Sequence, residues 1–179
     1  MKQNVCILIL VLFVNFSFGQ ILKITDFRKT YNDHNPTDHK QLLSKGFKLS
    51  TDSILTNKRK FIFKNQNSKE IIELTFIEDG EGSEYLNIKY FLTTELTYKK
   101  FISTLPTYKF KYSKRNKRYQ LPTSSYSGEN ISLNGLTQTD GQKYYSLEYN
   151  RYVDKALSGP RPEVRNNIEP PIESLSKSN

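Results

Sequence analysis

The chain has 179 residues and a formal net charge of +9, from 27 Lys and Arg against 18 Asp and Glu. A chain of this size can bury one core or two smaller ones. Its single cysteine, Cys6, excludes a fold held by disulfides, so stability has to come from core packing.

The first 19 residues have the pattern of a secretory signal peptide. Lys2 precedes an apolar run, residues 5–18, and small residues end in Gly19, which predicts cleavage before Gln20. The run is shorter than the roughly 20 residues of a spanning helix, so the mature chain is expected to have no membrane span. We expect export to a periplasm or out of the cell. This location excludes intracellular nucleic acid as a partner.

The mature chain is expected to prefer anionic partners. Removing Lys2 from the total of +9 leaves +8, and such an excess attracts an acidic protein surface or an anionic polymer.

A stretch of the sequence occurs twice, as GSEYLNIKY at 82–90 and GQKYYSLEY at 141–149. At this offset of 59 positions, residues 70–90 align with 129–149 without a gap. The pattern predicts two tandem repeats, 20–92 and 93–152, followed by a disordered Pro-rich tail at 153–179. The identical pairs are Glu70/Glu129, Ile72/Ile131, Leu74/Leu133, Gly82/Gly141, Tyr85/Tyr144 and Tyr90/Tyr149.

Each repeat is predicted to be α+β, with one or two short helices packed on a roughly four-stranded antiparallel sheet. In the first repeat, Thr25 is expected to cap a helix that ends at Tyr31, and Asp38 a second helix that ends at Gly46. Alternation of apolar and polar residues then predicts strands at 47–51, 59–65, 70–78 and 84–92.

The second repeat is expected to begin with Thr94 as the cap of a helix that stops at Pro106. Asp140-Gly141 is a strong signal for a tight turn. The repeated stretch is therefore interpreted as the last hairpin of each unit, repeated for structural reasons. We expect four residues of the first hairpin to occupy the same inward core positions as four of the second, namely Ile72, Leu74, Ile88 and Tyr90 against Ile131, Leu133, Leu147 and Tyr149. The strands predicted in this half are 107–113, 117–121, 129–136 and 143–150.

Residues that could carry chemistry are few. Both histidines lie in DHNPTDH, residues 33–39, whose spacing matches no metal motif and suits a capped loop between helices. The acidic segment 77–85 lacks the alternating ligands of a calcium-binding loop and is interpreted as a solvated turn. No nucleophile motif or phosphate-binding loop is recognisable. The sequence therefore predicts no catalytic residue, no metal site and no cofactor.

Segment 99–118 contains eight Lys or Arg and no acidic residue. Cations interleaved with aromatic residues can hold an anionic polymer, whereas lysines can also protect an edge strand from pairing. Within the strand that we predict here, Phe110 and Tyr112 are expected to point inward. The same alternation predicts that Tyr119 and Leu121 also point inward. Over the second repeat it predicts an exposed binding set of Lys109, Lys111, Arg118, Gln120, Tyr144 and Glu148.

The order of the predicted elements, with stretches such as HKQLLSKGF at 39–47, resembles the plan of exported tandem-repeat proteins such as the β-lactamase inhibitor proteins. The resemblance implies a binding protein and assigns no functional residue. We expect a secreted, non-enzymatic binding module that uses its open sheet face against a macromolecule. The alternatives are recognition of an anionic polysaccharide or other polymer through 99–118, and a hydrolase whose carboxylates are not identified.

Overall fold

The computed structural model describes residues 21–32, 39–78, 83–121 and 127–154. The predicted signal peptide and the loop residues 33–38 lie outside the described residues. So does the predicted tail, except for Val153 and Asp154, which end the last strand. None of the described helices is long and apolar enough to cross a membrane.

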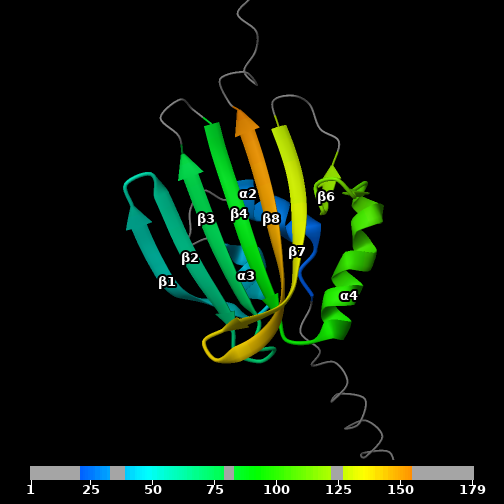
Figure 1. Cartoon of the computed structure of the whole chain (residues 1–179). Helices are drawn as coiled ribbons and strands as arrows, with labels where there is room; N and C mark the ends of the chain where they lie inside the picture. The colour runs from blue at the N-terminus through cyan, green and yellow to red at the C-terminus, as the bar shows by residue number, and fades with distance from the viewer. Residues whose placement is uncertain (1–20, 33–38, 79–82, 122–126, 155–179) are drawn as a thin grey trace, which may run out of the picture.

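The protein is α+β, as predicted, and strands dominate the fold. All eight described strands form one antiparallel sheet in the order β1-β2-β3-β4-β8-β7-β6-β5 (Figure 1). The sheet is continuous because β4 pairs with β8, the last strand in the chain. The strands are β1 (Phe47–Leu55), β2 (Lys58–Asn65), β3 (Ile71–Glu78), β4 (Ser83–Leu92), β5 (Lys111–Ser113), β6 (Arg118–Leu121), β7 (Ser127–Thr139) and β8 (Gln142–Asp154).

The helices are α2 (Ile24–Asn32), α3 (Lys40–Ser44) and α4 (Glu95–Thr104), and the 3-10 turn η3 (Leu105–Tyr108) follows α4. Thr94 caps α4 as predicted, since its hydroxyl oxygen accepts a hydrogen bond from the Thr97 backbone at 3.2 Å. The predicted cap at Thr25 is wrong, because α2 already begins at Ile24.

The helices and the sheet enclose one main core on one face of the sheet. Phe27 of α2 lies at its centre, with ring centroids 5.9 Å from Tyr90 on β4, 5.5 Å from Tyr149 on β8 and 5.7 Å from Phe101 on α4. Figure 1 shows α2 and α3 behind the sheet. Because α4 contacts the same ring, it packs on the same side.

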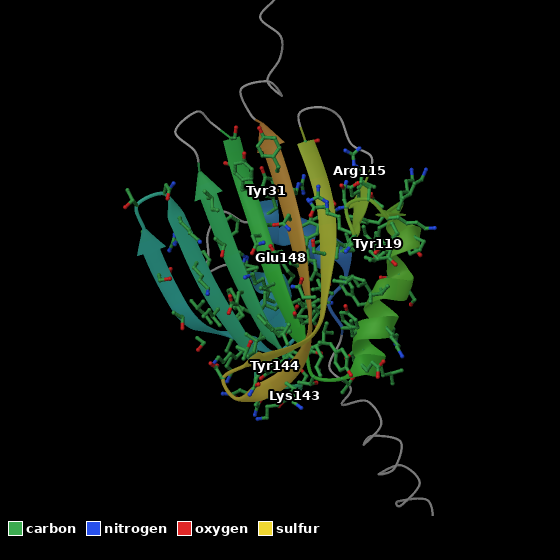
Figure 2. The ribbon with its side chains drawn as sticks, in the orientation of Figure 1. Tyr31, Arg115, Tyr119, Lys143, Tyr144 and Glu148 are labelled. Carbon is green, nitrogen blue, oxygen red and sulfur yellow. The ribbon has the colours of Figure 1, made fainter. Side chains whose placement is uncertain are left out.

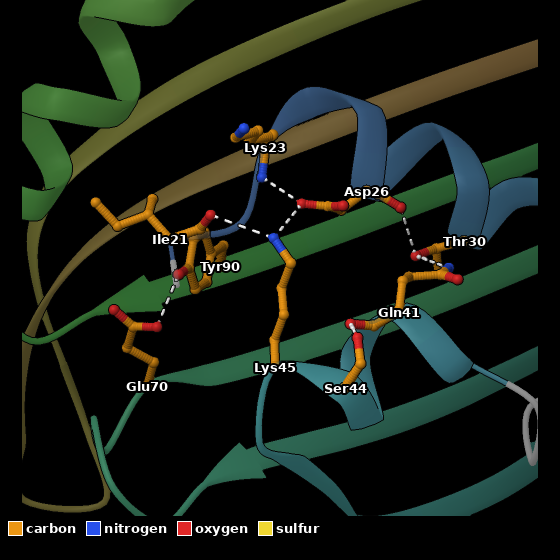
Figure 3. Close-up of polar contacts among 9 residues, drawn as sticks. All are labelled: Ile21, Lys23, Asp26, Thr30, Gln41, Ser44, Lys45, Glu70 and Tyr90. Atoms are coloured by element: carbon orange, nitrogen blue, oxygen red, sulfur yellow. Dashed lines mark hydrogen bonds and ion pairs between the residues drawn. The ribbon is translucent and has the colours of Figure 1, made fainter. Parts of the chain in front are cut away.

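Polar contacts fix α2 against α3 (Figure 3). The ammonium of Lys45 lies 2.8 Å from the carboxylate of Asp26, and both side chains are almost completely buried. The same carboxylate accepts a hydrogen bond from the Lys23 backbone at 2.7 Å, and Gln41 donates one to Thr30 at 3.1 Å. Because two short helices have little stability of their own, these bonds and the core below hold them in place.

The two predicted hairpins have matching registers. Ile72 lies opposite Tyr90, and Leu74 opposite Ile88, in the β3–β4 pair. At the equivalent places of the β7–β8 pair, Ile131 lies opposite Tyr149 and Leu133 opposite Leu147. All eight belong to or pack against the main core, as predicted, with Leu133 the least buried.

The β7–β8 hairpin is longer than predicted, and its tip bends over the other face of the sheet. A bulge separates Leu133 from Gly135, whose φ of +66° is accessible to glycine at little cost. The bend carries the tip across the lower ends of β2 and β3 (Figure 1). Tyr144 there joins a second small cluster with Ile71, Phe91 and Ile62.

Candidate binding face of the sheet

The open face is the side of the sheet opposite the main core, and no described helix lies on it (Figure 1). Strand alternation assigns its side chains, because residues two apart on a strand point the same way. Since Ile88 and Tyr90 point into the core, Asn87 and Lys89 point to the open face.

Four of the six predicted site residues lie on the open face with at least partly exposed side chains. Lys111 and Gln120 are cross-strand partners on β5 and β6, and Arg118 lies opposite Ser132 of β7. Glu148 is near the middle of the sheet (Figure 2). Tyr119 and Leu121 pack against the core, as predicted from the alternation.

The other two predicted site residues lie elsewhere or are covered. Lys109 is exposed, but it ends η3 with a φ of +66° and is not on a strand. Tyr144 is on the open face, yet only 4% of it is exposed, since the bent hairpin tip packs it against Phe91. The expectation of an exposed Tyr144 is therefore wrong. Tyr112 lies opposite Tyr119 on the core side of the sheet, as predicted, but it is 53% exposed and does not belong to the core.

A row of amide side chains crosses the middle of the open face. Asn87 of β4 donates hydrogen bonds to Asn150 of β8 at 2.7 Å and to Glu148 at 2.6 Å. Asn150 donates in turn to Asn130 of β7 at 3.4 Å. Gln120 is the cross-strand partner of Asn130, so the row of amides extends over four neighbouring strands.

Two tyrosine rings lie beside this amide row. Tyr85 and Tyr152 are cross-strand partners on β4 and β8, two residues along from Asn87 and Asn150. Their ring centroids are 4.6 Å apart, with an angle of 35° between the planes, and Tyr85 is 41% exposed. An exposed aromatic pair beside polar groups is a common feature of binding surfaces.

Charges of both signs lie on the other side of the amide row. Lys60 forms an ion pair of 2.9 Å with Glu73, and Lys89 is the cross-strand partner of Glu148. The centre of the open face is thus mixed in charge, whereas its β5–β6 edge is basic.

This basic edge, which we call the basic rim, consists of Lys111, Lys114, Arg115 and Lys117. All four side chains are exposed, and none forms an ion pair with another described residue. Figure 2 places Arg115 at this edge. The predicted segment 99–118 is therefore not one patch, since Lys99 lies on α4, where it pairs with Glu95 at 2.7 Å.

On the core side, a carboxylate is held by arginine. Arg28 of α2 donates to both oxygens of Glu129 on β7, at 3.0 and 3.2 Å. Burial, followed by the charge of Glu129, raises the pKa of Tyr149 well above its ordinary value. Burial and a hydrogen bond to Glu84 raise the pKa of Tyr31 to about 12. Neither phenol can therefore act as a base near neutral pH, and the cluster joins α2 to the sheet.

The acidic residues and the histidine of the described segments are dispersed over the fold. Among them, no group of three or more His, Cys, Asp or Glu comes together to hold a metal ion. Glu129 and Glu84 line different surface hollows. His39 is buried beside the rings of Phe61, Phe63 and Phe76, away from solvent.

Comparison with protein-family models, with curated proteins and with solved structures finds no match to this chain. The resemblance to the β-lactamase inhibitor proteins stays an interpretation of the element order, and no residue role follows from it.

The tyrosine pair and the amide row were not predicted from the sequence. The signal was present at 84–92, where Tyr85, Asn87 and Lys89 alternate with apolar residues. Their neighbours on β8 could not be assigned, because the pairing of β4 with β8 joins strands from the two predicted repeats.

Proposed function

We propose that this chain is an exported, non-enzymatic binding protein, whose open face and basic rim hold an anionic macromolecule. The observation that carries the proposal is a group of four exposed cations without ion pairs among the described residues, at the edge of a sheet face free of described helices. Such an arrangement raises the local concentration of a negatively charged partner.

The mixed charges at the centre of the face support a role in selectivity. Glu73 and Glu148 repel a partner with dense negative charge, and the neighbouring lysines and amides accept one with both polar and charged groups. The rim then attracts the partner and the centre of the face discriminates among partners.

We also propose that the face arose from a tandem duplication of one α/β unit. The identical registers of Ile72–Tyr90 and Ile131–Tyr149 support this idea. Glu70 and Glu129 precede these isoleucines by two positions in both copies, although Glu70 lies just before β3 and Glu129 lies on β7. Duplication would explain how a short unit forms a sheet wide enough for a polymer.

The proposal is tested by reversing charges on the rim. We expect Lys111→Glu with Lys114→Glu to raise the Kd for polygalacturonate and dextran sulfate by about tenfold at low ionic strength, because each reversal replaces attraction with repulsion. Binding is measured by isothermal titration calorimetry, and its loss on addition of salt checks the electrostatic origin.

The matched control is Lys29→Glu with Lys40→Glu. These lysines are exposed on α2 and α3, so the control has the same net charge as the rim variant but leaves the open face intact. Equal weakening in both variants would mean that net charge alone drives binding. No binding of either polymer by the unmodified protein would refute the proposed function outright.

A further inference from the structure

We propose that the open face is specific for an acidic polysaccharide, a polymer of sugars that each carry one carboxylate. The polymer would follow a track from the Tyr85–Tyr152 pair, over the amide row, to the basic rim. This inference rests on the proposed function and adds the class of ligand and the groups that recognise it.

The tyrosine pair supplies a surface for the apolar face of a sugar ring. One face of many sugar rings presents C–H groups, which pack on aromatic rings, while the hydroxyl groups point outward. Tyr85 is 41% exposed and is supported by Tyr152 at 4.6 Å, so it is accessible and held in position.

The amide row supplies hydrogen bonds suited to hydroxyl groups. A side-chain amide both donates and accepts, as a sugar hydroxyl does. The bonds from Asn87 to Asn150 and from Asn150 to Asn130 orient the amides in one direction. Each oxygen that accepts one of these bonds keeps a second lone pair for a ligand.

The spacing of the amides suits an extended polymer that crosses the strands. Neighbouring strands lie about 4.8 Å apart, so the row from Asn87 to Gln120 spans roughly 14 Å over three such steps. Successive sugars of one chain would thus meet successive amides.

The charges favour a sparsely charged polymer over a densely charged one. Lys111 of the rim is the cross-strand partner of Gln120, so the cations continue directly from the amide row. Glu148 accepts a hydrogen bond from Asn87 within the row and would repel phosphate or sulfate placed there. One carboxylate per sugar can lie at the rim while neutral hydroxyls cover Glu148.

The test compares three polymers with one pair of variants. The polymers are polygalacturonate, its carboxyl-reduced neutral form and dextran sulfate. Tyr85→Ala removes the exposed ring from the track. Tyr112→Ala is the matched control, because Tyr112 is 53% exposed, also lies beside a second tyrosine, Tyr119, at 5.2 Å, and belongs to the opposite face.

We expect the unmodified protein to bind polygalacturonate more tightly than the other two polymers. Tyr85→Ala should weaken this binding about tenfold, and Tyr112→Ala should change it less than twofold. Dextran sulfate binding should be the same in both variants. Asn130→Ala, measured beside a melting curve, gives a second test of the track in case Tyr85→Ala fails to fold.

The outcomes separate this inference from the proposed function. If dextran sulfate binds as tightly as polygalacturonate and neither Tyr85→Ala nor Asn130→Ala matters, the inference is wrong and the electrostatic binding function stands. Equal binding of the carboxyl-reduced polymer would also overturn it. If none of the anionic polymers binds, both proposals fail.

Discussion

Phe27 is the side chain whose loss the fold should tolerate least. It is 1% exposed and is the one described residue of α2 whose ring contacts β4, β8 and α4 together. A Phe→Ala change in a core costs about 3–5 kcal/mol, which is a large part of the roughly 5–15 kcal/mol that holds a domain folded. The milder Phe27→Leu is therefore the more informative variant.

The magnitude follows from the ring contacts. Leucine keeps most of the buried apolar volume but loses three aromatic pairs, each worth about 0.5–1.5 kcal/mol beyond its buried area. We expect a loss of about 1.5–3 kcal/mol in the free energy of unfolding. The loss should stay below the largest possible sum of the three aromatic pairs, because neighbouring side chains repack around the leucine and recover part of the lost packing energy.

Urea denaturation followed by circular dichroism measures this loss. The control is Leu96→Ala on α4, which is 77% exposed and should cost less than about 0.5 kcal/mol. A loss for Phe27→Leu no larger than for this control would refute the packing argument.

Two further changes test other parts of the fold. Burial raises the pKa of Glu70, although the hydroxyl of Tyr90 donates a hydrogen bond to it at 2.8 Å. A raised folded-state pKa means that the stability from this group is present below the unfolded pKa of about 4.3 and is lost as the pH rises through the folded value. Glu70→Gln should thus raise the melting temperature more at pH 7 than at pH 4, and the reverse order would contradict the sign. Gly135→Ala should lower the melting temperature by a few degrees, because a φ of +66° strains an alanine by roughly 1 kcal/mol. No clash adds to this strain, since nothing lies within 4 Å of the added methyl group. An unchanged melting temperature would show that the bend is not strained.

Local signals predicted much of the fold. The cap at Thr94 and the inward positions of Ile88 and Leu147 depend on neighbouring residues along the chain, and these predictions are confirmed. The strand at 107–113 was predicted too long, because Leu105–Tyr108 continues from α4 as a 3-10 turn. Alternation alone does not distinguish these two conformations over a few residues.

The candidate site was less predictable, because it depends on contacts between distant segments. Tyr144 has the sequence pattern of an outward residue, and only the bend at Gly135 brings it against Phe91. The amide row joins Asn87 to residues about sixty positions later in the chain, and this contact exists only in the observed strand order. A single sequence contains no direct record of that order.

The central position of β8 has a consequence for the order of folding. Strands β1 to β4 can pair with one another early, but β4 keeps an unpaired edge until residues 142–154 become available. Such an edge invites pairing with other chains. Completion of the sheet also closes a long loop, which makes this step slow compared with local hairpin formation. While the sheet forms, the half-folded protein is thus most vulnerable to aggregation just before its last strand inserts between β4 and β7.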